Sequence, residues 1–275
     1  MAMASLDVLD EIRHRLDDVG GDTGNPPAGY YARWQYDDSG CLWKNRELAA
    51  YLNEAIMDVG LRKPIYDADD ATICTISVVS GTRVYPIHPL IVSIQEVHLL
   101  SSGLSLIKTT TKRMRELIGR YRPAENWRVL PGAVTHYLED EADRKISLYH
   151  MPNTPDTLHL AVRRRFKDVV SWSAIANEAT PTTLLADIPD LYRSALVYGV
   201  TALAYRKRDA DTFNVDLAKE AEQMVEFEIG PKISFAQHEQ DRLSANLWRS
   251  KGNHEVFSPL AKPHSADPSQ AKVGE

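Results

Sequence analysis

Apolar side chains recur at helical spacing in two segments near the N-terminus. A shorter helix is predicted from Ser5, a favourable N-cap, to about residue 17. The clearer pattern lies in residues 43–59, where apolar positions fall at i, i+3, i+4, i+7, i+8 and i+11, the stripe of an amphipathic helix. These positions are Leu48, Tyr51, Leu52, Ala55, Ile56 and Val59. Gly60 is expected to end this helix.

After Pro64 the hydrophobic period changes to two, which indicates β-strands. Six strands are predicted, at residues 73–78, 83–87, 91–99, 133–139, 145–150 and 157–165, with a short helix at 112–118 between them. No helix of crossover length separates successive strands, as a parallel sheet would require. The pattern therefore favours an antiparallel sandwich or a barrel-like region.

Helical spacing returns near the C-terminal end. One helix is predicted to begin at Asp187 or Pro189, with one face formed by Leu191, Ala195, Tyr198, Gly199, Ala202 and Tyr205. A second helix is predicted from about residue 211 to Gly230, with Phe213, Leu217, Ala221, Met224 and Val225 directed inward. The two helices are expected to form an antiparallel hairpin.

None of these four helices can bury its apolar stripe alone, so we expect them to pack together. The predicted fold class is α+β. It is a four-helix bundle built from both ends of the chain, residues 1–66 and 185–230, with an inserted β-rich domain at residues 67–184. Residues 231–275 form an extended C-terminal arm in this interpretation.

Composition narrows the possible functions. The 275 residues include 32 basic and 38 acidic side chains, a formal net charge of −6 that disfavours a conventional DNA-binding protein. Two isolated cysteines, Cys41 and Cys74, fit a reducing compartment and offer no zinc site. No apolar stretch has the length of a membrane span, so we expect assembly in the cytoplasm without a membrane partner.

The common enzyme motifs are absent, including the Walker A loop, the dinucleotide-binding glycines, HExxH and GxSxG. The alternative hypothesis of a metal- or ligand-dependent enzyme would use His136, His159 and Asp140 in the β region. Histidines on a solvated or interface face are the simpler interpretation. The acidic run Asp67, Asp69 and Asp70 is interpreted as a solvated linker, with cation binding as its alternative. We predict neither a catalytic residue nor a cofactor.

Two further groups of residues are interpreted as subunit contacts. Consecutive strand residues point to opposite faces, so Arg163, Arg164 and Arg165 do not form one patch. Edge-strand protection or ion pairing at an oligomer interface is the expected role, with Arg163 and Arg165 at the interface. The loop aromatics Tyr30, Tyr31 and Trp34 are assigned to the same interface, although base stacking is an alternative for such aromatics.

An ordered set of sequence phrases resembles the tailed-phage head-to-tail adaptor (connector) proteins. The phrases are WKNREL at 43–48, YPI at 85–87, IVSIQEV at 91–97, ISLYHMP at 146–152, LHLAVR at 158–163, DIPDLY at 187–192 and AYRKRD at 204–209. The resemblance covers roughly residues 40–230.

This resemblance implies a structural virion protein and not an enzyme. Such adaptors form a ring, usually of twelve subunits, that joins the portal to a tail or nozzle protein and lets genomic DNA pass through its lumen. Another tail or baseplate module is the alternative within the same class of protein.

The C-terminal arm is predicted to dock on the portal or on a neighbouring subunit. It is rich in Pro, Ser and Lys yet carries apolar residues, a pattern typical of segments that fold on a partner. The predicted docking residues are Phe235, Leu243, Leu247, Trp248, Val256, Phe257 and Leu260.

Overall fold

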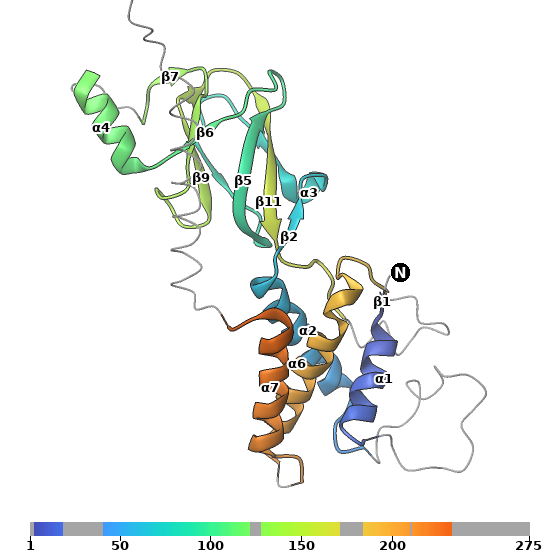
Figure 1. Ribbon diagram of the computed structural model, residues 1–275. Coiled ribbons are helices and arrows are strands. Elements are labelled where there is room, and N and C mark those ends of the chain that lie inside the picture. The colour runs from blue at the N-terminus through green and yellow to red at the C-terminus, as the bar shows by residue number, and fades with distance from the viewer. Residues whose placement is uncertain (1–2, 19–40, 122–127, 171–183, 210, 233–275) are drawn as a thin grey trace, which may run out of the picture. The chain divides into compact units, whose positions relative to one another are not determined.

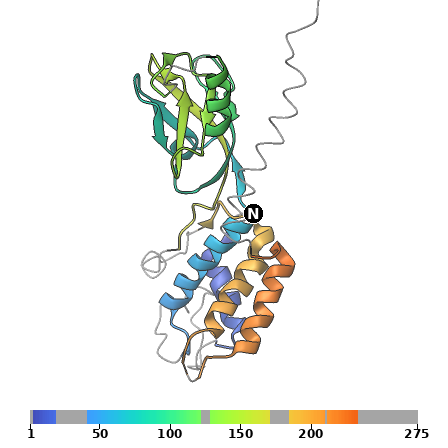
Figure 2. The same cartoon turned by 90° about the vertical axis from the view of Figure 1, so that its left-hand side faces the viewer.

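The computed structural model describes residues 3–18, 41–121, 128–170, 184–209 and 211–232. All of them belong to one compact unit, Met1–Ile233. The described α-helices are α1 (Ser5–Arg15), α2 (Asn45–Arg62), α3 (Ala71–Cys74), α4 (Thr111–Tyr121), α6 (Arg193–Tyr205) and α7 (Val215–Ile229), and the 3₁₀ helix η2 (Asp190–Tyr192) precedes α6. Figure 1 and Figure 2 show these elements from two sides.

The described strands form several small sheets, and none of these sheets closes into a barrel. The strands are β1 (Met3–Ala4), β2 (Ile65–Asp67), β3 (Thr75–Val78), β4 (Val84–Pro86), β5 (Ile91–Leu99), β6 (Ile107–Thr109), β7 (Pro131–Gly132), β8 (His136–Leu138), β9 (Lys145–Tyr149), β10 (Met151–Pro152), β11 (Asp156–Arg164) and β12 (Leu184–Leu185). One sheet contains β2, β3, β5 and β11, and another has the order β4-β9-β8-β6. The fold is therefore a mixed α+β fold, as the sequence predicts.

The helical core is organised around α6, which packs against α1, α2 and α7. Figure 2 shows α6 side by side with α7, and Figure 1 agrees. Close approach is possible because small side chains line the contacts. Gly199 of α6 faces Ala55 of α2, and a Cβ built on Gly199 would lie 3.2 Å from the Ala55 Cβ. The core of this region is thus packed through residues whose size leaves little spare volume.

The amphipathic stripe of α2 is buried as predicted, but the predicted end of the helix is wrong. Leu48, Leu52, Ile56 and Val59 are all buried, while α2 continues past Gly60 to Arg62. A Cβ on Gly60 would lie 3.1 Å from the Phe166 ring and 3.2 Å from the backbone nitrogen of Phe166. Gly60 therefore serves close packing against a distant segment and does not terminate the helix.

The inward face predicted for the last helix is partly wrong. Ala221 and Val225 are buried, but Phe213 and Leu217 are 53% and 40% exposed. The buried stripe runs instead through Ala218, Ala221, Val225 and Ile229, which is also spaced at i, i+3, i+7 and i+11. In the preceding helical segment Leu191 is likewise exposed. Small residues face α6 in place of the larger ones because the two helices lie close together.

The β region is built on one long antiparallel ladder. β5 pairs with β11 from Leu99 opposite Leu158 to Ile91 opposite Arg164, with two register shifts along the way. The other edge of β11 pairs with β3 and then with β2. β11 is therefore an interior strand, and edge-strand protection by its arginines, as expected from the sequence, is wrong.

Two further details of the β region differ from expectation. β6 pairs with β8 in parallel, as β7 does with β10, so the region is not wholly antiparallel. The predicted strand at residues 73–78 begins as the short helix α3 before β3. Asp70 causes this start because its carboxylate accepts a hydrogen bond from the Thr72 N–H, an N-cap interaction.

Candidate functional site

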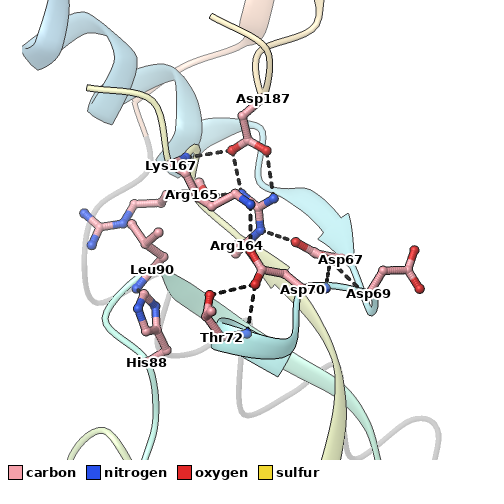
Figure 3. Close-up of polar contacts among 10 residues, drawn as sticks. All are labelled: Asp67, Asp69, Asp70, Thr72, His88, Leu90, Arg164, Arg165, Lys167 and Asp187. Carbon is pink, nitrogen blue, oxygen red and sulfur yellow. Dashed lines mark hydrogen bonds and ion pairs between the residues drawn. The ribbon is translucent and has the colours of Figure 1, made fainter. Parts of the chain in front are cut away.

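A buried arginine at the end of β11 gathers two carboxylates from distant segments (Figure 3). The Arg164 side chain is 4% exposed. Its Nη1 and Nη2 atoms donate to the two oxygens of Asp187 at 2.6 and 2.7 Å, and its Nε donates to Oδ2 of Asp67. Nη1 also donates to the carbonyl oxygen of Arg165 at 3.0 Å. A planar guanidinium with its donors in a rigid fork suits this two-sided arrangement.

Electrostatics at this site stabilise the charged forms of all three groups. Burial alone would raise the pKa of Asp67 and of Asp187, but hydrogen bonds from Arg164 and from backbone N–H groups lower both. The hydrogen bond with Asp187 raises the pKa of Arg164. Removing Arg164 or one of its carboxylate partners should cost stability, because it leaves a buried charge without compensation.

A second cation continues the same site towards the surface. Lys167 Nζ donates to Oδ2 of Asp70 at 2.6 Å, and the Lys167 N–H donates to Asp187 at 2.7 Å. The hydrogen bond from Lys167 lowers the pKa of the Asp70 carboxyl. Asp168 is also drawn in, because its Oδ2 accepts from the Asp187 N–H at 2.8 Å, although burial raises its pKa.

The residues that follow β11 are hydrogen-bonded to α2. The Asn53 side chain accepts a hydrogen bond from the Val170 N–H at 2.7 Å and donates to its carbonyl at 2.8 Å. Phe166 and Val170 are buried in the hydrophobic cluster that includes α2 and α6. Arg164, Phe166 and Val170 together join the main β ladder to the helical core. We call the set Asp67, Asp70, Arg164, Lys167 and Asp187 the polar junction.

Another buried arginine holds the residues that precede α2. Arg13 on α1 is 7% exposed and donates to Asp18 at 2.8 Å, to the Trp43 carbonyl at 3.0 Å and to the Asn45 side chain. The Asp18 carboxylate also accepts from the Trp43 N–H at 3.0 Å. The Trp43 indole in turn donates to the Ala204 carbonyl at 3.0 Å. This network has a structural role, since its donors and acceptors satisfy one another.

A match to a known protein family shows the family to which the chain belongs. A family model described as SU10 adaptor protein matches residues 3–249. The chain belongs to the SU10 adaptor protein family. No curated protein matches the sequence. The matched residues include every helix and strand given above, together with the polar junction.

Membership confirms the resemblance to phage adaptors noted in the sequence. The SU10 adaptor family supports a structural role in the phage virion, and adaptor status implies portal and tail partners. No described helix has both the length and the apolar character needed to span a membrane.

Of the predicted adaptor interface residues, the structure describes Arg163 and Arg165. Arg163 is exposed, and its Nη1 lies 3.5 Å from the Pro64 carbonyl oxygen. Arg165 is half-buried and donates to the Pro89 carbonyl at 2.9 Å. The alternation along the strand thus separates the buried Arg164 from Arg163 and Arg165, as predicted. The loop aromatics and the arm residues lie outside the described residues; they are Tyr30, Tyr31, Trp34, Phe235, Leu243, Leu247, Trp248, Val256, Phe257 and Leu260.

The three residues of the alternative enzyme site are not brought together. His136 lies on β8 and His159 on β11, which belong to different sheets. The Asp140 carboxylate accepts from the N–H and hydroxyl of Thr111 at the start of α4. Burial, together with the nearby charges of His150 and Arg113, lowers the pKa of His136. Within the described ranges, no group of three His, Cys, Asp or Glu side chains is placed to hold a metal ion.

The polar junction is the site that sequence reasoning missed. Asp67 and Asp70 were expected in a solvated linker, yet they bind Arg164 and Lys167 of the same chain. The acids and bases are separated by 97 positions, so no local motif reveals the pairing. The available signal was an arginine at a position where the alternation of Leu158, Leu160 and Val162 predicts an inward side chain, because a buried charge requires a partner.

Proposed function

We propose that this chain is a head-to-tail adaptor subunit that assembles into a ring, twelve subunits in the usual case, between the portal and the tail. Genomic DNA passes through the lumen of this ring without sequence-specific binding. Assembly takes place in the host cytoplasm, and the protein performs no catalysis.

The observation that carries the proposal is the family match over residues 3–249, which extends across the helical core, the β region and the polar junction. The polar junction supports a structural role. A subunit that transmits load between two partners needs its parts joined by more than a flexible linker. Here a hydrogen-bonded arginine and the buried residues Phe166 and Val170 provide that connection.

The net charge of −6 per subunit also fits a channel for DNA. A ring multiplies this charge, and a negative assembly resists adhesion of DNA during ejection where its acids face the lumen.

Negative-stain imaging of the purified chain with and without its portal tests the proposal. We expect a coaxial ring on the portal, and light scattering should give a mass that is an integral multiple of 30.9 kDa. Portal alone and chain alone are the controls. A chain that stays monomeric and unbound at every portal concentration would contradict the proposal.

We further propose that the C-terminal arm docks on the portal or on a neighbouring subunit. The hydrophobic cores formed within Met1–Ile233 support this proposal, because they give that part of the chain cores of its own. Deletion of residues 234–275 should leave a folded, soluble subunit that no longer joins the portal. An unstable or aggregating product would instead indicate an arm that packs on its own helices.

The absence of catalysis is tested at the alternative site. Replacement of His136 and His159 with alanine should leave assembly on the portal nearly intact. Elemental analysis of wild type and variant provides the second measurement, and a metal lost on substitution would contradict a purely structural function.

A further inference from the structure

Two described helices carry unbalanced charge of opposite sign. α7 contains five acids and one base, and α4 contains four bases and one acid. The α7 acids are Asp216, Glu220, Glu222, Glu226 and Glu228, and the α4 bases are Lys112, Arg113, Arg115 and Arg120. In α1 and α2, acids and bases nearly balance, and α6 has a single charged residue.

One side of α7, outside its buried stripe, combines acids with large apolar side chains. Leu217, Glu220, Met224, Phe227 and Glu228 follow the spacing i, i+3, i+7, i+10 and i+11, so they share one side of the helix. Phe227 is 83% exposed, and Leu217 is 40% exposed. An aromatic ring exposed to water does not stabilise the subunit. Its burial against a partner removes a large apolar area from water and favours binding.

The exposed side of α4 offers the complementary chemistry. Lys112 and Arg115 are exposed one turn apart, while Met114 is buried with Leu138. Ile107, on the neighbouring strand β6, is 58% exposed. β6 lies at the edge of its four-stranded sheet. The exposed basic side chains of α4 and the exposed apolar side chain of β6 are therefore close to one another in the sequence.

We propose that α7 of one subunit binds α4 of a neighbouring copy of the same chain. This inference rests on the proposed self-association and names the two faces that form it. A ring requires a heterologous contact, in which two different faces of one subunit meet in adjacent copies. Opposite net charge on α4 and α7 provides such a pair of faces, with Glu220 and Glu228 opposite Lys112 and Arg115 and with Phe227 as the apolar anchor.

The complementarity favours a second copy over DNA as the occupant. DNA could bind the bases of α4, but it would leave the acidic and aromatic face of α7 without a partner. A neighbouring subunit satisfies both faces with one contact. A contact between α4 and α7 of neighbouring subunits also explains why these two helices carry net charges of opposite sign, whereas the other described helices are nearly neutral.

Charge reversal in the full-length chain tests the interface. One variant carries Lys112→Glu and Arg115→Glu, and the other carries Glu220→Lys and Glu228→Lys. Like charges facing each other should raise the concentration needed for ring assembly by roughly tenfold or more in either variant alone. An equal mixture of the two should assemble at the wild-type concentration, because each subunit then meets an oppositely charged neighbour. A chain with all four changes should also recover assembly.

The matched control reverses two exposed charges on α2, Arg46→Glu and Glu54→Lys, and should assemble like the wild type. Circular dichroism and thermal unfolding verify that each variant is folded. Phe227→Ser provides an independent arm, and it should weaken assembly without lowering thermal stability.

The outcomes separate this inference from the proposed function. If the wild type forms no ring with or without portal, the proposed function fails and this interface fails with it. Rings from both reversed variants at the wild-type concentration would overturn the interface alone. If the mixture does not recover assembly while the α4 variant loses binding to a short DNA duplex, α4 faces DNA, and the inference is wrong.

Discussion

The helical core and the β region of this adaptor are held together by different kinds of contact. In the helical core, α6 lies close to its neighbours because glycine and alanine occupy the contacts, as at Gly199 and Ala55. In the β region, the ladder of β5 and β11 buries branched side chains such as Leu158, Leu160 and Val162. The helical core is therefore sensitive to added volume at these close contacts, whereas both regions are sensitive to lost volume where they bury large apolar side chains.

The polar junction is where these two kinds of packing meet. The same strand that supplies Leu160 to the β core ends in Arg164, whose partner Asp187 lies just before η2. Arg164 occupies a position of β11 where the alternation of the strand would otherwise place an apolar residue. Its removal should thus have a larger effect than a typical substitution in either core.

The largest expected effect follows from Arg164→Ala. This change leaves the carboxylates of Asp67 and Asp187 partly buried without their cation, which should lower the free energy of unfolding by about 3–5 kcal/mol. Urea unfolding at neutral pH measures the loss. Arg163→Ala on the exposed side of the same strand is the matched control and should stay within about 0.5 kcal/mol of wild type. Equal losses in the two variants would mean that the junction is not a stabilising pair.

Truncation of a core leucine should destabilise both regions. Leu52→Ala in α2 and Leu160→Ala in β11 each remove a side chain with no exposed surface, for an expected cost of about 2–5 kcal/mol. Leu217→Ala on the outward side of α7 is the comparison and should cost about 1 kcal/mol or less, because that side chain is 40% exposed. A large loss at Leu217 in the isolated subunit would place it in the core after all.

Added volume should distinguish the helical core from its surface. Gly199→Leu forces a side chain against Ala55, and we expect a cost of about 1–3 kcal/mol from overpacking. Ala50→Leu adds the same kind of side chain on the exposed side of α2 and should be nearly neutral. If thermal unfolding shows no difference between these two variants, the close contact of α6 with α2 is wrong.

Sequence patterns predicted the four helices of the helical core, but in the β region they missed the short strands β2, β6, β7 and β10, and they predicted the buried faces unequally. Alternation in residues 91–99 predicted β5 with its bounds as observed, because a strand has only two faces and one of them is apolar. In α6 buried residues occur on several sides, since α6 contacts three other helices. Its neighbour α7 then offers two plausible stripes, and the choice between them depends on how closely the helices approach. That distance is a property of the pair and cannot be read from either helix alone.

The candidate site was predictable only in part for a similar reason. Alternation separated Arg164 from Arg163 and Arg165, and it was sufficient to reject a single basic patch. Its partners were not predictable, because Asp67 and Asp187 are brought to Arg164 by tertiary structure and not by spacing.

The last expected effect depends on pH and concerns acid stability in the β region. Burial would raise the pKa of Glu141, but ion pairs with Arg83 and Arg128, at 2.6 Å each, lower it to about 2. A carboxyl group whose pKa is lower in the folded state contributes stability above its unfolded value, near 4.5, and loses it as the pH falls towards about 2. Glu141→Gln should therefore be less stable than wild type at pH 6, and the difference should shrink steadily between pH 4.5 and pH 2. Urea unfolding across this range measures the difference, with Glu54→Gln on the exposed side of α2 as the matched control. A difference for Glu141→Gln that stays constant with pH would show that the pairs with Arg83 and Arg128 act through packing, and not through the charge of the carboxylate.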